Sequence, residues 1–167
     1  MLVAAHAFGD ARTELIEGDV ILMSPQYRPH GMVKLALYDA FREALQNSNS
    51  ALTAVTEFSL ALDNHTMPEP DIMLTTEPSG DGPVPFASVA LVIEVADTTL
   101  DIDLGRKAAL YAGAKVPEYW VADVANRVIH QMWLPESAAY TKKSEISLDA
   151  MLTTRTIAGL TISIGSD

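Results

Sequence analysis

The stretch from Ala90 to Val124 constrains the fold more than any other part of the sequence, because its pattern is that of a strand, a helix and a second strand. Residues 90–93 form an uninterrupted apolar run, which is typical of a strand buried on both faces. The run meets a carboxylate at Glu94, where burial of a charge is costly. Residues 119–122 form another apolar run and predict the second strand.

The segment between these two runs has helical spacing. Leu104, Ala108 and Tyr111 recur on one helical face, and Gly113 followed by Pro117 supplies a stop signal. A strand, a crossover helix and a strand make a βαβ unit. We therefore expect the two strands to be parallel and the crossover to be right-handed.

Weaker patterns predict the elements around this unit. Residues 14–23 indicate a hairpin of two short strands around a Gly18-Asp19 turn, and residues 30–47 carry one apolar helical face. Residues 75–88 contain three prolines and two glycines and are expected to form a loop. Further strands are expected near residues 51–62, 72–74, 127–133, 140–146 and 160–164.

The length and composition limit the class of protein. The chain has 167 residues, and we expect one domain spanning residues 1–167. It has no cysteine, which excludes thiolate zinc sites, iron–sulfur clusters, cysteine nucleophiles and disulfides. No basic amino-terminal segment precedes an apolar run, and no apolar run approaches the roughly 18 residues of a membrane span. The expectation is a soluble, cytoplasmic protein without membrane contact.

The formal net charge of −11 works against charge-driven attraction to nucleic acid, because Lys and Arg contacts with phosphates supply most of the nonspecific affinity. The basic residues closest in sequence to the candidate site are Arg28, Lys34 and Arg106. We expect them to form a small positive patch, so that binding to DNA would be weak and salt-sensitive, with a shallow salt slope.

Two carboxylates have the spacing of a metal site. Asp71 opens one predicted strand and Glu94 closes the next long one, 23 residues later. If these strands are antiparallel neighbours, both carboxylates lie at the same edge of the sheet. Proteins usually hold Mg²⁺ with one or two carboxylates and leave open positions for water and phosphate oxygens.

Three further side chains are candidates for the same cleft. Lys107 lies one helical turn beyond Asp103 and is placed to extend an ammonium group towards the carboxylates. A lysine there would orient an attacking water or stabilise charge developing on a phosphate. His30 begins the first predicted helix and is the third candidate.

Structural interpretations stay open for the two carboxylates. Asp71 follows Pro70 and is compatible with a simple turn residue. Glu94 is compatible with a strand-end carboxylate that accepts backbone hydrogen bonds from the turn at residues 97–99.

The other candidates have alternatives too. Asp103 and Lys107 stand at i and i+4, the spacing of a surface ion pair worth about 0.2–0.5 kcal/mol. His30 is compatible with a half-exposed histidine at a helix start. The aromatic residues of the βαβ unit are expected in the core rather than as base-stacking residues; they are Tyr111, Tyr119 and Trp120.

At these residues the chain resembles the Uma family of bacterial proteins described as restriction endonucleases, a branch of the PD-(D/E)XK nuclease superfamily. The resemblance runs from about Glu14 to Ile164. Its strongest segments are residues 14–18, Met23-Ser24-Pro25 with His30, Pro70-Asp71, Ile93-Glu94-Val95 with residues 97–100, Asp103 with Lys107, and residues 111–123.

The resemblance implies a restriction-endonuclease-like α+β fold, with a mixed sheet flanked by helices in the core order αβββαβ and an N-terminal hairpin. It also implies Asp71 and Glu94 as metal ligands. Lys107 would be the catalytic lysine, and His30, Asp97 and Asp103 would line the cleft or support the ligands.

The chain departs from the family pattern in two respects at position 96, two residues after the implied metal ligand Glu94. The superfamily motif would place a lysine at position 96, where this chain has Ala96, and Lys107 on the following helix matches the position to which the family has moved it. Similar sequences often have serine at position 96, so a supporting hydroxyl would be absent here.

These features together predict a Mg²⁺- or Mn²⁺-dependent endonuclease that hydrolyses phosphodiester bonds in DNA. A homodimer is expected, because cutting both strands of a duplex needs two sites and twofold symmetry provides them. The alternative is a noncatalytic interaction or regulatory module that keeps the fold and some carboxylates. Binding of a divalent cation discriminates between the two.

Overall fold

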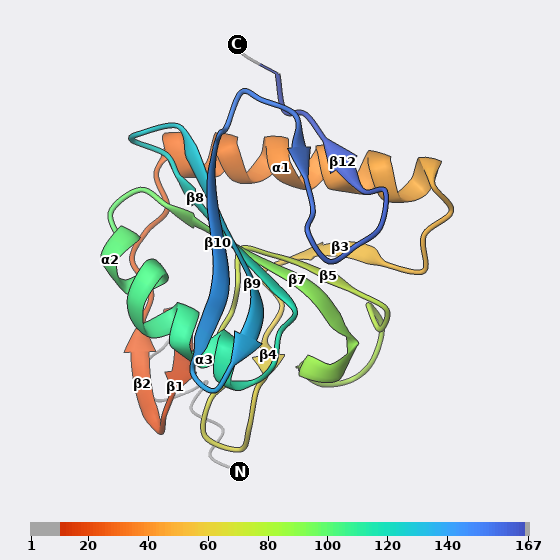
Figure 1. Ribbon diagram of the computed structural model, residues 1–167. Helices are drawn as coiled ribbons and strands as arrows, with labels where there is room; N and C mark the ends of the chain where they lie inside the picture. Colours follow the sequence, from red (N-terminus) through yellow and green to blue (C-terminus); the bar gives the residue numbers. More distant parts are fainter. Residues whose placement is uncertain (1–10, 166–167) are drawn as a thin grey trace.

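The computed structural model describes residues 11–165, which fold around a six-stranded mixed sheet (Figure 1). The strand order is β10-β9-β8-β7-β5-β3. The strands are β3 (Thr53–Thr56), β5 (Ile72–Thr75), β7 (Val89–Ala96), β8 (Glu118–Asp123), β9 (Val128–Glu136) and β10 (Ala139–Ser147).

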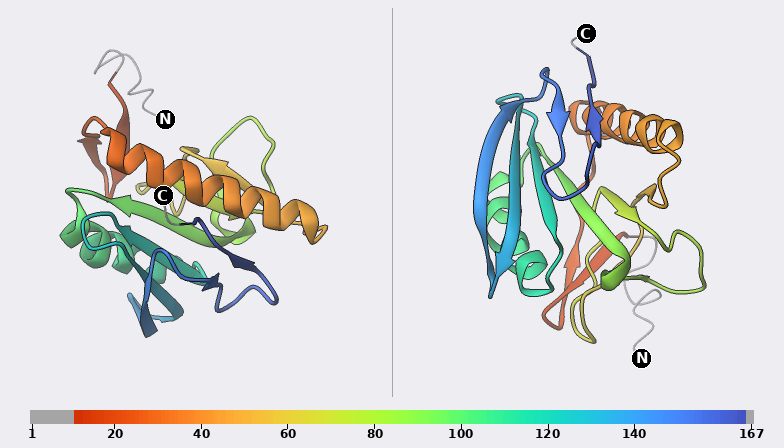
Figure 2. Two further views of the ribbon diagram at one scale, coloured as in Figure 1. Left: turned by 90° about the horizontal axis from the view of Figure 1, so that it is seen from above. Right: turned by 45° about the vertical axis from the view of Figure 1, so that its right-hand side comes forward.

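Helices cover the sheet from both sides, as the two views of Figure 2 show. The long helix α1 (Arg28–Asn47) lies on one face. The other face carries a continuous helical segment made of α2 (Leu100–Ile102), a π-helical turn (Asp103–Lys107) and α3 (Ala108–Gly113). The expected α+β order αβββαβ is therefore present as α1, β3, β5, β7, the α2–α3 segment and β8.

The predicted βαβ unit forms the centre of the sheet. Strands β7 and β8 are parallel, with Leu91 opposite Glu118 and Ala96 opposite Asp123. Strand β5 pairs with β7 in the antiparallel direction, with Ile72 opposite Ile93. Glu94 is not the last residue of its strand, because β7 continues to Ala96.

The hydrophobic core has one half on each face of the sheet. Under α1, Leu37 and Phe41 are fully buried, and the Phe41 ring lies 5.5 Å from the Trp120 ring, centroid to centroid. Under α3, the Tyr111 and Tyr119 rings lie 4.9 Å apart. These aromatic residues of the βαβ unit are buried in the core, as expected from the sequence.

The N-terminal hairpin consists of β1 (Thr13–Ile16) and β2 (Asp19–Leu22). Its turn is Glu17-Gly18 rather than the predicted Gly18-Asp19, because Ile16 pairs with Asp19. Both turn residues have positive φ, 51° and 89°. Two left-handed residues give the twist that a two-residue hairpin needs, and glycine adopts this conformation at no steric cost.

The prediction of a structureless loop at residues 75–88 was wrong in its second half. Strand β6 (Val84–Pro85) pairs in parallel with β4 (Leu60–Ala61), and a 3₁₀ turn follows at Phe86–Ser88. Val84 is buried, so this short pairing is held by packing that the proline-rich sequence does not reveal.

A buried carboxylate anchors the C-terminal segment, in which β11 (Leu152–Thr153) pairs with β12 (Thr161–Ile162). Glu118 is fully buried and accepts hydrogen bonds from the backbone N–H groups of Arg155 and Thr156 and from Trp120 Nε1. Its charge is therefore satisfied by donors within the fold. Strand β11 was not expected from the sequence.

In the part of the chain that the structure describes, no helix is long and apolar enough to cross a membrane.

Candidate active site

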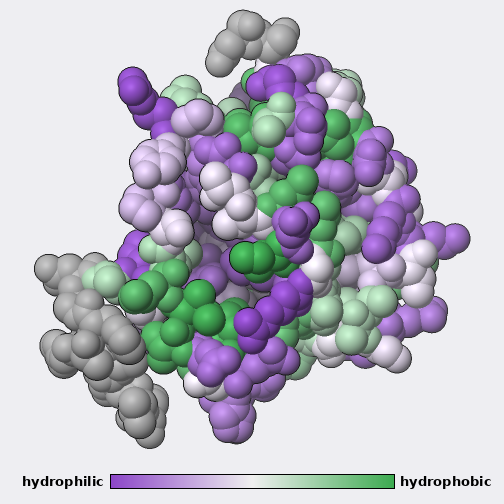
Figure 3. All heavy atoms as spheres, turned by 90° about the vertical axis from the view of Figure 1, so that its left-hand side faces the viewer, coloured by the Kyte–Doolittle hydropathy of each residue, from purple (hydrophilic) through white to green (hydrophobic). Residues whose placement is uncertain are grey.

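A cavity of about 220 Å³ opens on the face of the molecule that carries β2 and α2 (Figure 3). Its lining comes from segments far apart in the sequence: the hairpin, the start of α1, the segment before β5, the end of β7 and the α2 region. All six candidate residues from the sequence line it, namely His30, Asp71, Glu94, Asp97, Asp103 and Lys107.

The pairing of β5 with β7 brings the two predicted ligands to this cavity. Because Ile72 pairs with Ile93 in antiparallel register, Asp71, the residue immediately before β5, lies beside Glu94 of β7. Asp71 Oδ2 accepts the backbone N–H of Val95 at 2.8 Å, which ties its carboxylate to β7. Asp71 is therefore more than a turn residue.

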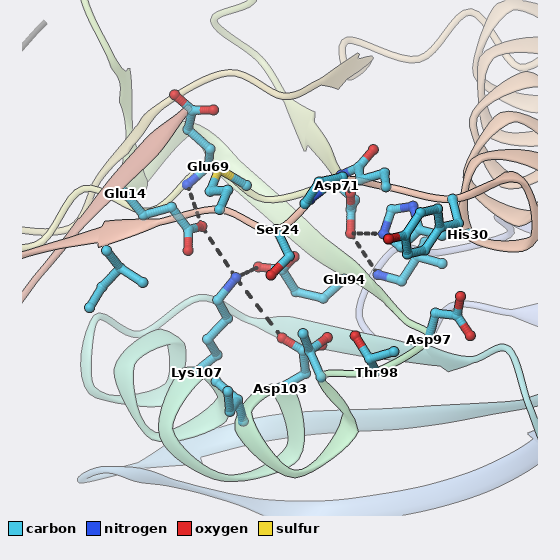
Figure 4. Close-up of a pocket in the computed structure, with 18 of the residues that line it drawn as sticks. Glu14, Ser24, His30, Glu69, Asp71, Glu94, Asp97, Thr98, Asp103 and Lys107 are labelled. Atoms are coloured by element: carbon cyan, nitrogen blue, oxygen red, sulfur yellow. Dashed lines mark hydrogen bonds and ion pairs between the residues drawn. The ribbon is translucent and has the colours of Figure 1, made fainter. Parts of the chain in front are cut away.

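Three other groups contact the Asp71 carboxylate, two of them from α1, and Figure 4 shows His30 beside it. His30 Nε2 lies 3.3 Å from Oδ2, Gln26 Nε2 donates to Oδ1 at 3.1 Å, and Lys34 Nζ lies 3.7 Å from Oδ1. Burial raises the pKa of Asp71, but the hydrogen bond and charge of His30, the Val95 N–H and the charge of Lys34 outweigh it, so that the pKa is lowered. This carboxylate is held as an anion.

Glu94 has the opposite electrostatic character. Its side chain is almost fully buried, and Oε1 accepts hydrogen bonds from Tyr111 Oη at 2.7 Å and Lys107 Nζ at 3.1 Å. Burial, together with the negative charges of Asp103, Asp71 and Glu14, raises its pKa to about 8 against the opposing charge of Lys107. A nearby cation would favour its charged form.

Lys107 lies among three carboxylates. Its Nζ is 3.1 Å from Glu94 Oε1, 3.2 Å from Glu14 Oε1 and 3.9 Å from Asp103 Oδ1. Burial lowers the pKa of Lys107, but the three carboxylates outweigh burial and the pKa is raised. The lysine is thus a buried ammonium group inside the cavity, and the interpretation of Asp103 and Lys107 as a surface ion pair is wrong.

Asp103 begins the π-helical turn that ends at Lys107, a local irregularity that recurs at functional sites. Thr99 Oγ1 donates to its Oδ2 at 2.5 Å. Burial and the charges of Asp71 and Glu14 raise its pKa to about 6, although Lys107 and the Thr99 hydrogen bond oppose the shift. Asp103 therefore adds to the excess of negative charge around Lys107.

Sequence reasoning gave no role to Glu14, which the structure places in the cavity. The residue is buried, and its Oε1 accepts the backbone N–H of Glu69 at 3.0 Å as well as the Lys107 ammonium. The available signal was its position on β1, where the side chains at positions 14 and 16 point inward and Glu14 is the charged one.

Two expectations near the site need correction. Ala96 is buried with the apolar cluster under α3 and does not line the cavity, so a hydroxyl at this position would face core side chains. The positive patch is weaker than expected, because Arg106 pairs with Glu17 at 2.9 Å and Lys34 pairs with Glu57 at 2.7 Å.

The carboxylates fit a divalent cation with few protein ligands. Across residues 11–165, no group of three or more His, Asp or Glu side chains is arranged to hold a metal. Mg²⁺ usually keeps several waters and binds through one or two carboxylates. Asp71 and Glu94 are two such carboxylates, and burial, with the neighbouring carboxylates, raises the pKa of Glu94, so a cation bound there would favour its charged form.

The sequence profile of a family described as "Uma2: Putative restriction endonuclease" matches residues 5–165. The chain belongs to the Uma2 family. This confirms the resemblance inferred from the sequence motifs. No curated protein sequence matches the chain significantly.

A solved relative shares the Uma2 chain's fold. It is a crystal structure titled as a "putative nuclease belonging to DUF820" from Anabaena variabilis ATCC 29413. The TM-score is 0.72 at 14% sequence identity, and the match covers 93% of this chain and 89% of that one. At this identity the likeness shows the fold, and it extends over nearly the whole of both chains.

Proposed function

We propose that this protein is an endonuclease that hydrolyses phosphodiester bonds in DNA with the help of Mg²⁺ or Mn²⁺. The observation that carries the proposal is the convergence of Asp71, Glu94 and Lys107 in one cavity. Membership of a family described as restriction endonucleases supports it. The PD-(D/E)XK pattern would then be met by Asp71, Glu94 and a lysine moved to the next helix.

In this proposal Asp71 and Glu94 hold the cation. When bound, it supplies Lewis-acid charge for the phosphate oxygens on which negative charge develops. His30, Gln26 and the Val95 N–H orient the Asp71 carboxylate. Tyr111 orients Glu94 through its hydroxyl, so neither ligand is free to rotate away from the cavity.

Lys107 contributes positive charge rather than a base. Its raised pKa keeps it an ammonium group at neutral pH, so it cannot accept the proton of the attacking water. It can donate hydrogen bonds to that water or to a phosphate oxygen as negative charge builds up. Glu14 and Asp103 also contact the ammonium group and would keep it at the cavity wall if Glu94 held a cation.

The second candidate function is a noncatalytic interaction module. It is favoured by the net charge of −11 and by the ion pairs that already occupy Lys34 and Arg106. Such a module would have no reason to retain a divalent cation site.

Incubation of the purified protein with supercoiled plasmid and with single-stranded DNA tests the proposal, at low ionic strength with Mg²⁺ and with Mn²⁺. Cleavage should appear with either cation, stop with chelator, and be lost in Asp71→Asn and Glu94→Gln, because each variant removes one of two anionic ligands. Glu136→Gln, which changes an exposed acidic residue outside the cavity lining, is the control. No cleavage of either substrate, or full activity in both ligand variants, would support the interaction module.

The homodimer is part of the proposal for cutting duplex DNA, because one active site faces one strand. The candidate interfaces are apolar residues of the hairpin and of the C-terminal segment, represented by Leu22 and Met151. Sedimentation at micromolar concentration should detect a dimer, and Met151→Ser and Leu22→Ser distinguish the two surfaces. A monomer throughout this range would contradict the dimer.

A further inference from the structure

The mouth of the candidate active site is apolar. Four exposed apolar residues line the same cavity as the buried carboxylates, and they come from β2, from the residue before α1 and from α2. They are Ile21, Leu22, Tyr27 and Ile102, with Leu22 59% and Tyr27 68% exposed. Figure 3 shows apolar surface gathered beside a hollow on this face. We call these four residues the apolar rim.

The charges around the apolar rim do not suit the backbone of a duplex. Lys107 is buried among carboxylates, Arg106 pairs with Glu17, and Lys34 pairs with Glu57. Arg28 is exposed and follows Tyr27 in the sequence, so at most one phosphate contact near the rim is expected from it. A duplex presents its phosphates outward and hides the faces of its bases, so its binding depends on several cations.

An unpaired nucleotide has different requirements. Every base has an apolar face that stacks on an aromatic ring, and such stacking contributes about 1–3 kcal/mol per base with little dependence on sequence. This term does not need cations. Such stacking suits this cavity, because its exposed lining includes Tyr27 and aliphatic side chains and its buried lining includes carboxylates.

We infer that the cavity binds an unpaired stretch of DNA, with a base stacked on Tyr27 and packed against Leu22 and Ile102. The adjoining phosphate then lies over Asp71 and Glu94. The inference rests on the proposed function for cleavage, whereas binding by the apolar rim stands separately. It predicts that single strands, frayed ends and bulges are better ligands than a continuous duplex.

Fluorescence anisotropy with a short labelled single strand, alone and annealed to its complement, tests the inference in the Glu94→Gln background, where cleavage is not expected. The single strand should bind roughly tenfold more tightly than the duplex. Tyr27→Ala should weaken single-strand binding by about tenfold, and Leu22→Ser should also weaken it. Leu35→Ser changes an exposed apolar residue that does not line the cavity and should leave binding unchanged.

The salt dependence gives a second readout. One phosphate contact by Arg28 corresponds to a slope of about −0.7 in log affinity against log salt for a single strand, and Tyr27→Ala should leave this slope unchanged. Equal affinity for single strand and duplex, absence of single-strand binding, or unchanged affinity in both rim variants would overturn the inference. So would sedimentation showing that Leu22→Ser converts a dimer to a monomer, because the rim would then be covered by a second copy.

The cleavage assay separates this inference from the proposed function. If duplex plasmid is cut equally well by the parent and by Tyr27→Ala, and single strands are not preferred, the nuclease function stands and the inference fails. If single strands bind through the apolar rim and no substrate is cut with either cation, binding stands and the nuclease function fails.

Discussion

Lys107 Nζ lies 3.1 Å from Glu94 Oε1, and this pair is buried beneath the mouth of the cavity. The ammonium group also faces Glu14 and Asp103 and opposes the repulsion among these carboxylates. Lys107 therefore has two effects. It stabilises the buried carboxylates, and it places a positive charge beside the proposed metal ligands.

Lys107→Ala should cost both turnover and stability. The three carboxylates would lose their shared partner, and removal of one member of a buried ion pair costs about 3–5 kcal/mol. We therefore expect a lower melting temperature at neutral pH together with loss of most cleavage. Arg106→Ala, which removes an exposed pair with Glu17, should change stability by less than about 1 kcal/mol. Equal melting temperatures for the two variants would contradict this account.

The metal-free protein should become less stable as the pH rises from about 5 to about 8. The pKa of Glu94 is about 8 in the folded protein against an ordinary value of 4.5, so in this window the unfolded chain has released a proton that the folded chain retains. The free energy of unfolding therefore falls as the pH rises. The stabilisation from protonated Glu94 is fully present below pH 4.5 and is lost above about pH 8. Asp103, raised from 3.8 to about 6, adds to the fall at the acidic end.

Thermal unfolding in chelator at several pH values measures this fall. Glu94→Gln cannot titrate at this position and should show a flatter profile. Mg²⁺ should restore more stability at pH 8 than at pH 5, because it binds the charged carboxylates. A parent protein whose melting temperature rises steadily from pH 5 to pH 8 would argue against the raised pKa of Glu94.

His30→Ala should weaken metal binding more than it weakens the fold. His30 contacts Asp71 Oδ2, and loss of a group that orients a metal ligand typically costs roughly 10–100-fold in metal affinity or activity. Titration of Mn²⁺ by calorimetry measures the affinity. His30→Gln retains a donor and should recover part of it, whereas His65→Ala, in an exposed turn, should have no effect. Unchanged Mn²⁺ affinity in His30→Ala would make the histidine a structural residue only.

Glu118→Ala should destabilise the protein without a specific effect on the site. The variant leaves the backbone N–H groups of Arg155 and Thr156 and the Trp120 indole N–H without their acceptor, and each unsatisfied buried donor costs about 1–3 kcal/mol. Chemical denaturation should show a loss of several kcal/mol. Glu136→Ala, at an exposed position, is the control. Intact stability in Glu118→Ala would mean that the C-terminal segment is held mainly by its apolar contacts.

The sequence predicted the centre of the fold better than its periphery. The two strands around residues 90–93 and 119–122 are continuous apolar runs, and the structure pairs them in parallel as expected. Strands β6 and β11 have two residues each and were missed, because such short pairings are held by distant packing and leave no periodic pattern.

The sequence predicted which residues form the candidate site better than it predicted the contacts between them. Asp71 and Glu94 could be paired because a reversing loop separates two predicted strands, and the register Ile72 to Ile93 agrees with that pairing. The contact between Glu14 and Lys107 joins residues 93 positions apart, and no local pattern specifies it. The alternative interpretation of Asp103 and Lys107 as a surface ion pair failed because both side chains are largely buried, and i, i+4 spacing says nothing about burial.

By itself the sequence determined which segments become strands and helices at the centre of the sheet, since apolar periodicity and turn residues act over a few neighbouring positions. It also determined the family, through motifs that occur in the right order along the chain. Only the tertiary structure decided which charges share a cavity, because packing of the hairpin against the α2–α3 segment places Glu14 beside Lys107 and lines the mouth with apolar side chains. Burial of these charges then sets their pKa values, and burial is a property of the assembled fold.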